Sequence, residues 1–212
     1  MRRIHRLAAA IVTAFTCASA SATVIATVVS NDATYGVIDG SQATRALRVD
    51  GRGRIIDVNI TVAFSKCDNP PIGPNGSACI GRGSPFENEF TLVLTAPGGQ
   101  PVTLVRAFNT YRAGSNGGAG RVSVTFDDEA LRAAGPRVRA GSFRPAESLA
   151  LFDEMNPYGR WTLYLRDFST SDPLEYFSSS LNIAYEPIPE PGTLAILGLG
   201  LGLMGMRAAR RR

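Results

Sequence analysis

The sequence has very few of the residues from which most hydrolytic and metal sites are built. Its 212 residues include one histidine, His5, and one lysine, Lys66. A serine-protease triad needs a histidine beside its serine, and histidine is also the commonest metal ligand. A Ser–Lys nucleophile would depend on Lys66, and no recognisable serine motif accompanies it. We therefore interpret the protein as non-catalytic. The open alternative is a hydrolase with a pair of carboxylates, drawn from Asp127, Asp128, Asp153 and Glu154.

The first 22 residues have the order of a secretory signal peptide. Three arginines lie within the first six residues, and an apolar stretch from 7 to 17 follows. That stretch is too short for an ordinary membrane-spanning helix. A run of Ala and Ser then offers cleavage after Ala20 or Ala22. We predict that residues 1–22 are removed on export and that 23–49 join the folded domain.

Cysteine is scarce, and its positions agree with export. Loss of the signal peptide removes Cys17 and leaves Cys67 and Cys79, an even pair in an oxidising compartment. The segment 68–76 between them is rich in Pro and Gly, which suits a loop. We predict a Cys67–Cys79 disulfide that stabilises the fold by roughly 3 kcal/mol. Two unpaired thiols are the alternative.

The formal net charge of +4 does not describe the body of the chain. Part of the positive charge belongs to the signal peptide, and part to a basic tail at 207–212. The tail arginines are Arg207, Arg210, Arg211 and Arg212. Neither segment contains an acidic residue, so the rest of the chain is net acidic. We predict no nucleic-acid partner.

The middle of the chain alternates apolar and polar residues with a period of two, which is typical of half-buried strands. The clearest set, expected on one strand face, is Ile56, Val58, Ile60, Val62 and Phe64. Similar patterns occur at 90–94, 102–104, 122–126, 161–165 and 181–185, and only 147–154 looks helical. Strands with one apolar face bury it by packing as two sheets, so we predict an all-β, antiparallel β-sandwich.

The only tryptophan, Trp161, shares its predicted strand face with Leu163 and Leu165. We therefore expect it in the core rather than on a sugar-binding surface. Tyr158 lies in a Pro- and Gly-containing turn and is the better candidate for an exposed aromatic side chain.

The C-terminal segment differs from the predicted sandwich in composition. Residues 186–192 form a Pro-rich linker, 193–206 an apolar run, and 207–212 the basic tail. As a helix the apolar run is roughly 21 Å long, against a hydrocarbon core of ~30 Å. Its glycines suit a membrane helix better than a soluble one, and the basic tail would face the cytoplasm. We predict a short C-terminal membrane helix that leaves the sandwich outside.

This arrangement of Pro189, Glu190 and Pro191, an apolar run and terminal arginines resembles the PEP-CTERM sorting signal of Gram-negative bacteria. The resemblance implies an exosortase that recognises the tail and cleaves near the Pro-Glu-Pro motif. It also implies a protein that is anchored in the membrane facing the periplasm. From there the protein would reach the cell surface or the extracellular matrix.

Residues 50–185 resemble the P domain (P/Homo B domain) of subtilisin-like proprotein convertases. The segments that carry the resemblance are 56–62 (IDVNITV), 92–99 (LVLTAPGG), 125–130 (TFDDEA) and 156–167 (NPYGRWTLYLRD). The resemblance implies a jelly-roll-like β-sandwich.

Two features depart from that family. The Cys67–Cys79 loop stands where its members have a short connection, and Ser179 stands near an expected tryptophan. Tyr176 and Phe177 are the candidate substitutes for that tryptophan.

Three consecutive acidic residues, Asp127, Asp128 and Glu129, stand at the end of a predicted strand. They could supply oxygen ligands to Ca²⁺, and the resemblance permits such a site. Calcium takes six to eight oxygens, so loop carbonyls or Asp167 would have to contribute. The alternative is that these acids accept amide hydrogen bonds in the turn that leads into Ala130.

These observations favour an exported, non-catalytic interaction protein that is anchored or sorted at the cell envelope. One alternative is an accessory or stabilising module for a separate subtilisin-like protease. The other is a module that binds carbohydrate or exopolysaccharide, which the fold alone does not establish.

Overall fold

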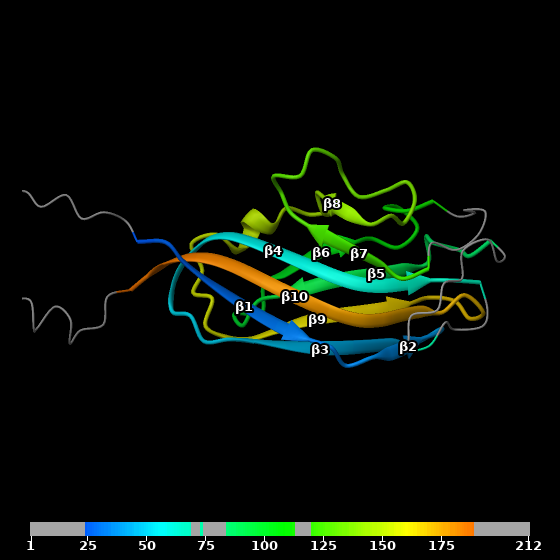
Figure 1. The fold of residues 1–212 in the computed structure, drawn as a ribbon, viewed down its shortest axis with the longest axis horizontal. Helices are drawn as coiled ribbons and strands as arrows, with labels where there is room; N and C mark the ends of the chain where they lie inside the picture. The colour runs from blue at the N-terminus through cyan, green and yellow to red at the C-terminus, as the bar shows by residue number, and fades with distance from the viewer. Residues whose placement is uncertain (1–23, 69–72, 74–83, 113–119, 189–212) are drawn as a thin grey trace, which may run out of the picture.

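The computed structural model describes residues 24–68, 73, 84–112 and 120–188, which form two packed β-sheets (Figure 1). Ten strands and one short 3-10 helix follow one another along these residues. They are β1 (Ala26–Asp32), β2 (Gly36–Ile38), β3 (Gln42–Val49), β4 (Gly53–Lys66), β5 (Phe90–Thr95), β6 (Pro101–Val105), β7 (Val122–Phe126), β8 (Gly141–Phe143), η1 (Leu149–Phe152), β9 (Gly159–Asp167) and β10 (Leu174–Pro187). The predicted all-β sandwich is confirmed.

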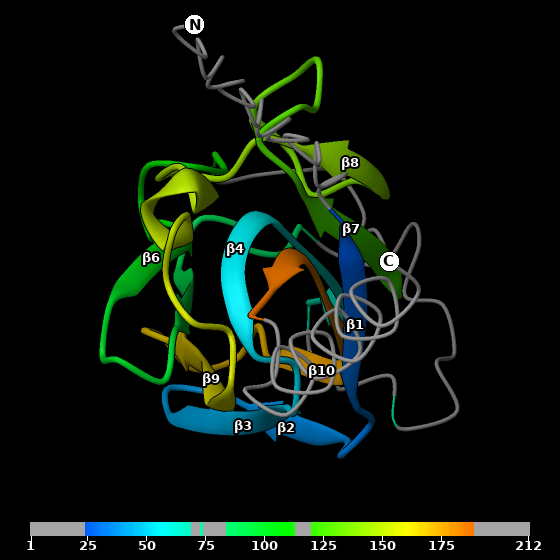
Figure 2. The same cartoon turned by 90° about the vertical axis from the view of Figure 1, so that its left-hand side faces the viewer.

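The two sheets differ in size. The larger has the order β1-β10-β4-β7-β8, with β2 also paired to β10, and the smaller has the order β3-β9-β5-β6. All pairs are antiparallel except β7 with β8. Figure 2 looks along the strands, with β3, β9 and β6 in one layer and β1, β10, β4 and β7 in the other.

The core lies between the sheets and is apolar and aromatic. Trp161 is completely buried, as its strand face predicts, and its ring meets that of Phe152 edge-on at 4.9 Å. The indole Nε1 donates to the carbonyl of Pro157 at 2.8 Å, which satisfies its one polar group. Tyr158 is 37% exposed, with the Arg52 guanidinium 3.6 Å from its ring centre.

One strand face differs from the predicted pattern. Ile55 is buried, whereas Ile56 is 38% exposed. The register between β4 and β10 shifts between Ala184 and Tyr185, so one extra residue of β4 is accommodated there. This bulge reverses the alternation N-terminal to Val58, and the prediction that Ile56 points into the core is wrong.

The 3-10 helix η1 is the short helical element expected within 147–154. Ser148 caps it, because its hydroxyl accepts from the amide of Ala150 at 3.2 Å. Among the residues that the structure describes, no helix has the length and apolar character to cross a membrane. The predicted signal peptide and the predicted membrane helix at 193–206 lie outside those residues.

Both ends of the described chain belong to the larger sheet. Strand β1 pairs with β10 from Ala26↔Tyr185 to Asp32↔Ser179. Strand β10 continues through Pro187, two residues into the segment that the sequence assigns to the linker. The sandwich therefore includes residues on both sides of the 50–185 range.

Candidate functional site

A buried lysine organises one end of the sandwich. Lys66 is the last residue of β4, and its side chain is completely buried. Its Nζ donates to Glu89 Oε1 at 2.7 Å, to Asp167 Oδ2 at 2.8 Å and to the backbone carbonyl of Asp172. The three N–H groups of the ammonium thus each have an acceptor.

Strand register brings these residues together. Lys66 pairs with Leu174 at the start of β10, and Asp167 pairs with Phe90 at the start of β5. Glu89 directly precedes β5, so all of these positions meet where four strands begin or end. The Asp167 carboxylate also accepts from the amides of Leu174 at 3.0 Å and Ser169 at 3.3 Å.

Burial dominates the electrostatics of the surrounding acids. It raises the pKa values of Glu89 and Asp167, and the hydrogen bond from Lys66 opposes the shift in both. It also raises the pKa of Asp172, where the amide of Phe86 opposes the shift and the Asp68 carboxylate adds to it. Each carboxyl group is therefore easier to protonate in the folded protein than in the unfolded chain.

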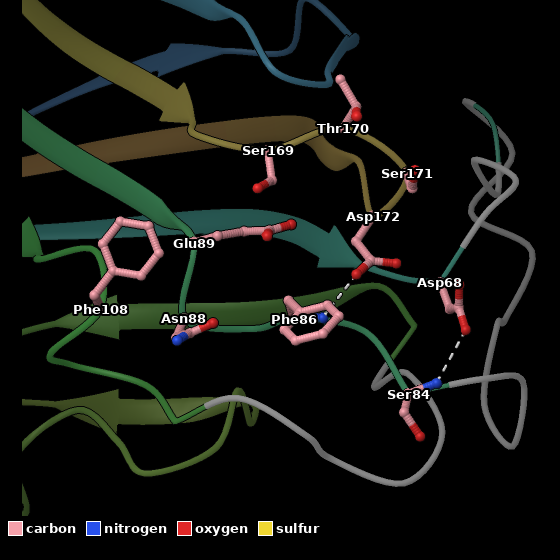
Figure 3. Close-up of a pocket in the computed structure, with 10 residues that line it drawn as sticks. All are labelled: Asp68, Ser84, Phe86, Asn88, Glu89, Phe108, Ser169, Thr170, Ser171 and Asp172. Atoms are coloured by element: carbon pink, nitrogen blue, oxygen red, sulfur yellow. Dashed lines mark hydrogen bonds between the residues drawn. The ribbon is translucent and has the colours of Figure 1, made fainter.

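A pocket of about 550 Å³ opens beside this network (Figure 3). Its lining residues are Asp68, Ser84, Phe86, Asn88, Glu89, Phe108, Ser169, Thr170, Ser171 and Asp172. Three of them are carboxylates and none is cationic. Backbone amides fix two of these acids: Phe86 N donates to Asp172 at 3.0 Å, and Ser84 N donates to Asp68 at 3.0 Å.

Exposed phenylalanines accompany these acids. Phe86 is 55% exposed and Phe108 is 65% exposed, and Figure 3 shows both beside Glu89. Phe108 adopts a positive φ of 59°, and its amide donates to Asn88 O at 2.5 Å. Its ring lies 5.7 Å from that of Phe168. An acidic hollow with aromatic side chains suits a cationic group, which both carboxylates and ring faces attract.

Two of the predicted calcium residues accept hydrogen bonds from nearby protein groups. Asp127 Oδ1 accepts from the amide of Glu129 at 2.7 Å, and Asp128 Oδ2 accepts from Ser148 Oγ at 2.6 Å and the amide of Ala150 at 2.9 Å. The Asp127 contact is the turn contact of the alternative interpretation, whereas Asp128 bonds to the start of η1, which that interpretation did not include.

Two further acids lie near these residues: burial is the main cause that raises the pKa values of Asp57 and Asp153, and the charge of Asp128 adds to both shifts. Asp167, considered as an additional calcium ligand, is instead bonded to Lys66. In the described part of the chain, no group of three or more His, Cys, Asp or Glu is arranged to hold a metal ion. Calcium binding stays a prediction.

Cys67 follows β4 directly and is buried and disulfide-bonded. Its expected partner, Cys79, lies outside the described residues, so the pairing stays a prediction. The sorting residues Pro189, Glu190 and Pro191 and the basic tail lie outside them as well.

Our sequence-based reasoning missed the pocket and the ion network. The burial of Lys66 could have been predicted from the sequence, because the β4 alternation that places Phe64 inward also places Lys66 inward. The acids that meet Lys66 come from segments distant in sequence, and no local pattern connects them.

Comparison with known proteins identifies the C-terminal segment. Residues 187–212 match the family model of the PEP-CTERM protein-sorting motif. No curated protein matches the sequence.

Three solved structures show partial similarity to the sandwich. The serine protease of Aeromonas sobria, in complex with the chaperone ORF2, is 12% identical, with a TM-score of 0.46 over 77% of this chain and 27% of that chain. The same protease alone gives 14% identity and a TM-score of 0.43, over 76% of this chain and 27% of the protease. FLHE gives 13% identity and a TM-score of 0.33, over 76% of this chain and 97% of FLHE.

The chain thus spans 27% of the protease's length. The family match lies at its C-terminus. Residues 187–212 are a PEP-CTERM protein-sorting motif, which implies processing by an exosortase and sorting to the cell envelope of a Gram-negative bacterium.

Proposed function

We propose that this protein is an exported, non-catalytic interaction module that its C-terminal motif delivers to the cell envelope. The observation that carries the proposal is the junction at Pro187, which is both the last residue of β10 and the first residue of the matched motif. The sandwich is complete where the sorting segment begins. Its function is therefore expected to be that of a binding domain held at, or released from, the envelope.

The sandwich is proposed to be P-domain-like. The segments that carry the sequence resemblance fall on β4, on β5 and the turn after it, on β7, and on β9. These elements belong to both sheets, so the resemblance extends over the core of the domain.

The environment of Lys66 supports a non-catalytic role. A lysine that acts on a substrate must be able to reach it. The Lys66 side chain is completely buried, and its ammonium group donates to two carboxylates and one carbonyl.

The pocket beside Lys66 is the proposed binding site. Asp68, Glu89 and Asp172 supply negative charge, and Phe86 and Phe108 supply exposed aromatic surface. A partner protein that inserts an arginine or lysine side chain would satisfy both features.

Site-specific crosslinking tests this proposal in cells. A photoreactive phenylalanine analogue at Phe108 should give discrete adducts in the envelope fraction, and Asp68→Asn with Asp172→Asn should weaken them. The matched control is the same analogue at Val29, which is 53% exposed on β1. Equal adducts at both positions, or none at Phe108, would contradict the binding site. Hydrolytic activity of the purified protein would contradict the non-catalytic role.

A further inference from the structure

The segment between β7 and η1 concentrates arginine. Residues 130–146 contain four arginines and no acidic residue, although the body of the chain is net acidic. Together with one arginine from the preceding loop they form what we call the arginine surface: Arg112, Arg132, Arg137, Arg139 and Arg144. All five are exposed.

Backbone hydrogen bonds hold these arginines in one region. Arg144 N donates to Arg132 O at 2.8 Å, and Ala134 N donates to Arg144 O at 2.9 Å. Arg112 N donates to Pro136 O at 2.7 Å, which places Arg112 beside the residue that precedes Arg137. Residues 132–137 therefore link the two pairs of arginines.

A buried anchor fixes the same segment to the sandwich. Val138, between Arg137 and Arg139, is 3% exposed, and its amide donates to Glu87 Oε2 at 3.1 Å. The two arginines consequently project from a short stretch of chain that is fixed at its centre. In Figure 1 the segment lies along the β8 edge of the larger sheet.

The positive charge of this surface is not neutralised by ion pairs within the described residues. The arginines there that pair with carboxylates are Arg45, Arg48, Arg54 and Arg106, all outside the arginine surface. The acids that flank this segment in the sequence are Glu129 and Glu147, and Glu147 is paired with Arg106. Hydrogen bonding to Asp127 raises the pKa of Glu129, and the other charges that contribute are acidic.

We propose that the arginine surface binds an acidic polysaccharide through the carboxylates of its sugar units. Guanidinium groups stay charged and pair with planar carboxylates through two parallel hydrogen bonds. An extended polyanion can engage several arginines in succession, as the linked pairs allow. The site is separate from the Lys66 pocket, so the proposal goes beyond the function proposed above.

An anionic membrane surface fits less well. Surfaces that lie in a lipid interface combine basic residues with several exposed apolar or aromatic side chains. Here Leu131 is 94% exposed, but Phe143 is partly buried and Val138 is buried. One exposed leucine is ordinary for a soluble surface.

Binding of the protein from residue 23 to 212, with its tail uncleaved, to polygalacturonate in a neutral detergent tests the proposal. We expect binding that weakens with added salt, and no binding to neutral dextran. Arg137→Gln with Arg139→Gln should weaken it about tenfold. The matched control is Arg48→Gln with Arg160→Gln, exposed arginines that face each other across β3 and β9. It removes the same charge and should leave binding within about twofold. The basic tail is common to all variants, so differences between them report the sandwich.

Each outcome decides the proposal. Loss of affinity in the Arg137/Arg139 variant alone, with an unchanged melting temperature, supports it. Equal loss in both variants would show attraction to net charge only and would overturn it. No binding to polygalacturonate would overturn it as well. Tighter, Arg137/Arg139-dependent binding to phosphatidylglycerol vesicles than to polygalacturonate would assign the surface to lipid instead.

Discussion

Lys66 Nζ and Asp167 Oδ2 lie 2.8 Å apart, and both side chains are completely buried. Lys66 ends β4 of the larger sheet and Asp167 ends β9 of the smaller one, so this ion pair joins the two layers at one end of the sandwich. Such a buried ion pair stabilises the fold little more than an apolar contact would, but the loss of one partner leaves a buried, uncompensated charge.

Replacement of the lysine should therefore be severe. We expect Lys66→Met to lower the free energy of unfolding by about 3–5 kcal/mol, measured by urea denaturation. Adding Glu89→Gln and Asp167→Asn to that variant should restore part of the loss, because no unpaired charge remains. Arg48→Met is the control: its side chain is 79% exposed and paired with exposed Asp50, so about 0.5 kcal/mol or less is expected. A Lys66→Met protein as stable as wild type would contradict the argument.

The buried acids predict a pH dependence of stability. The pKa values of Glu89, Asp167 and Asp172 are raised in the fold, mainly by burial. Above the ordinary carboxyl pKa of about 4, the folded protein then binds more protons than the unfolded chain. The contribution of these groups to the free energy of unfolding is fully present at low pH, and it is lost as the pH rises through their raised pKa values. The melting temperature should therefore increase on mild acidification from neutral pH.

An asparagine substitution isolates one of these groups. Asp172→Asn keeps an oxygen for the Phe86 amide but cannot titrate, so its melting temperature should depend less on pH than that of wild type. Glu147 acts in the opposite direction, because the Thr103 amide lowers its pKa. Its contribution to stability is therefore lost only as the pH falls below the ordinary carboxyl pKa. Identical pH profiles for wild type and Asp172→Asn would remove Asp172 from the explanation.

The sequence predicted the buried face of β4 correctly over most of the strand, but not near its start. Alternation correctly placed Val58, Ile60, Val62 and Phe64 in the core, because side chains of a regular strand point to alternate faces. It failed at Ile56, where the pairing partner β10 shifts register. A bulge depends on both strands, and one of them lies more than a hundred residues further along the chain.

The candidate site was less predictable than the fold. Asp68, Glu89 and Asp172 line one pocket only because β4, β5, β9 and β10 begin or end at the same place. Each acid looks like a solvated loop residue in its own local sequence. By contrast, the sorting motif is contiguous, so the sequence alone was sufficient to find it.

The Cys67–Cys79 pairing can be tested chemically. Unfolded, unreduced mature protein should show no free thiol, and a non-reducing digest should link the two peptides. Cys67→Ser with Cys79→Ser should lower stability by roughly 3 kcal/mol, because the loop is no longer closed in the unfolded chain. Two labelled thiols per chain would show that the predicted bridge is absent.

Calcium binding at Asp127, Asp128 and Glu129 is tested by melting in calcium and in chelator. A ligand bound only to the folded state raises stability, by about 2.7 kcal/mol at a hundred times its Kd. Neutral amides at these three positions should abolish the calcium increment, whereas Asp39→Asn with Asp50→Asn, at exposed positions, should preserve it. An identical melting temperature in calcium and chelator would exclude the site.

The final prediction separates folding from sorting. Glu186 Oε2 accepts from Arg54 Nε at 2.9 Å, and the amide of Ile188 donates to Arg52 O at 3.4 Å. The sandwich thus holds the chain up to Ile188, and a variant that ends there should keep every contact of β10. We expect it to be soluble and to melt like the full-length protein, yet to be lost from the membrane fraction.

Changing Pro189, Glu190 and Pro191 to alanine should have the opposite effect, because it leaves the apolar run and basic tail intact but alters the motif that an exosortase would read. This variant should stay in the membrane and fail to mature. Cell fractionation and the intact mass of the envelope form distinguish the two outcomes. If the protein ending at Ile188 unfolds, the sandwich depends on the tail and the two units are not independent. If wild type retains Arg212 in cells with an active exosortase, the motif does not direct cleavage, and the protein reaches the envelope by another route.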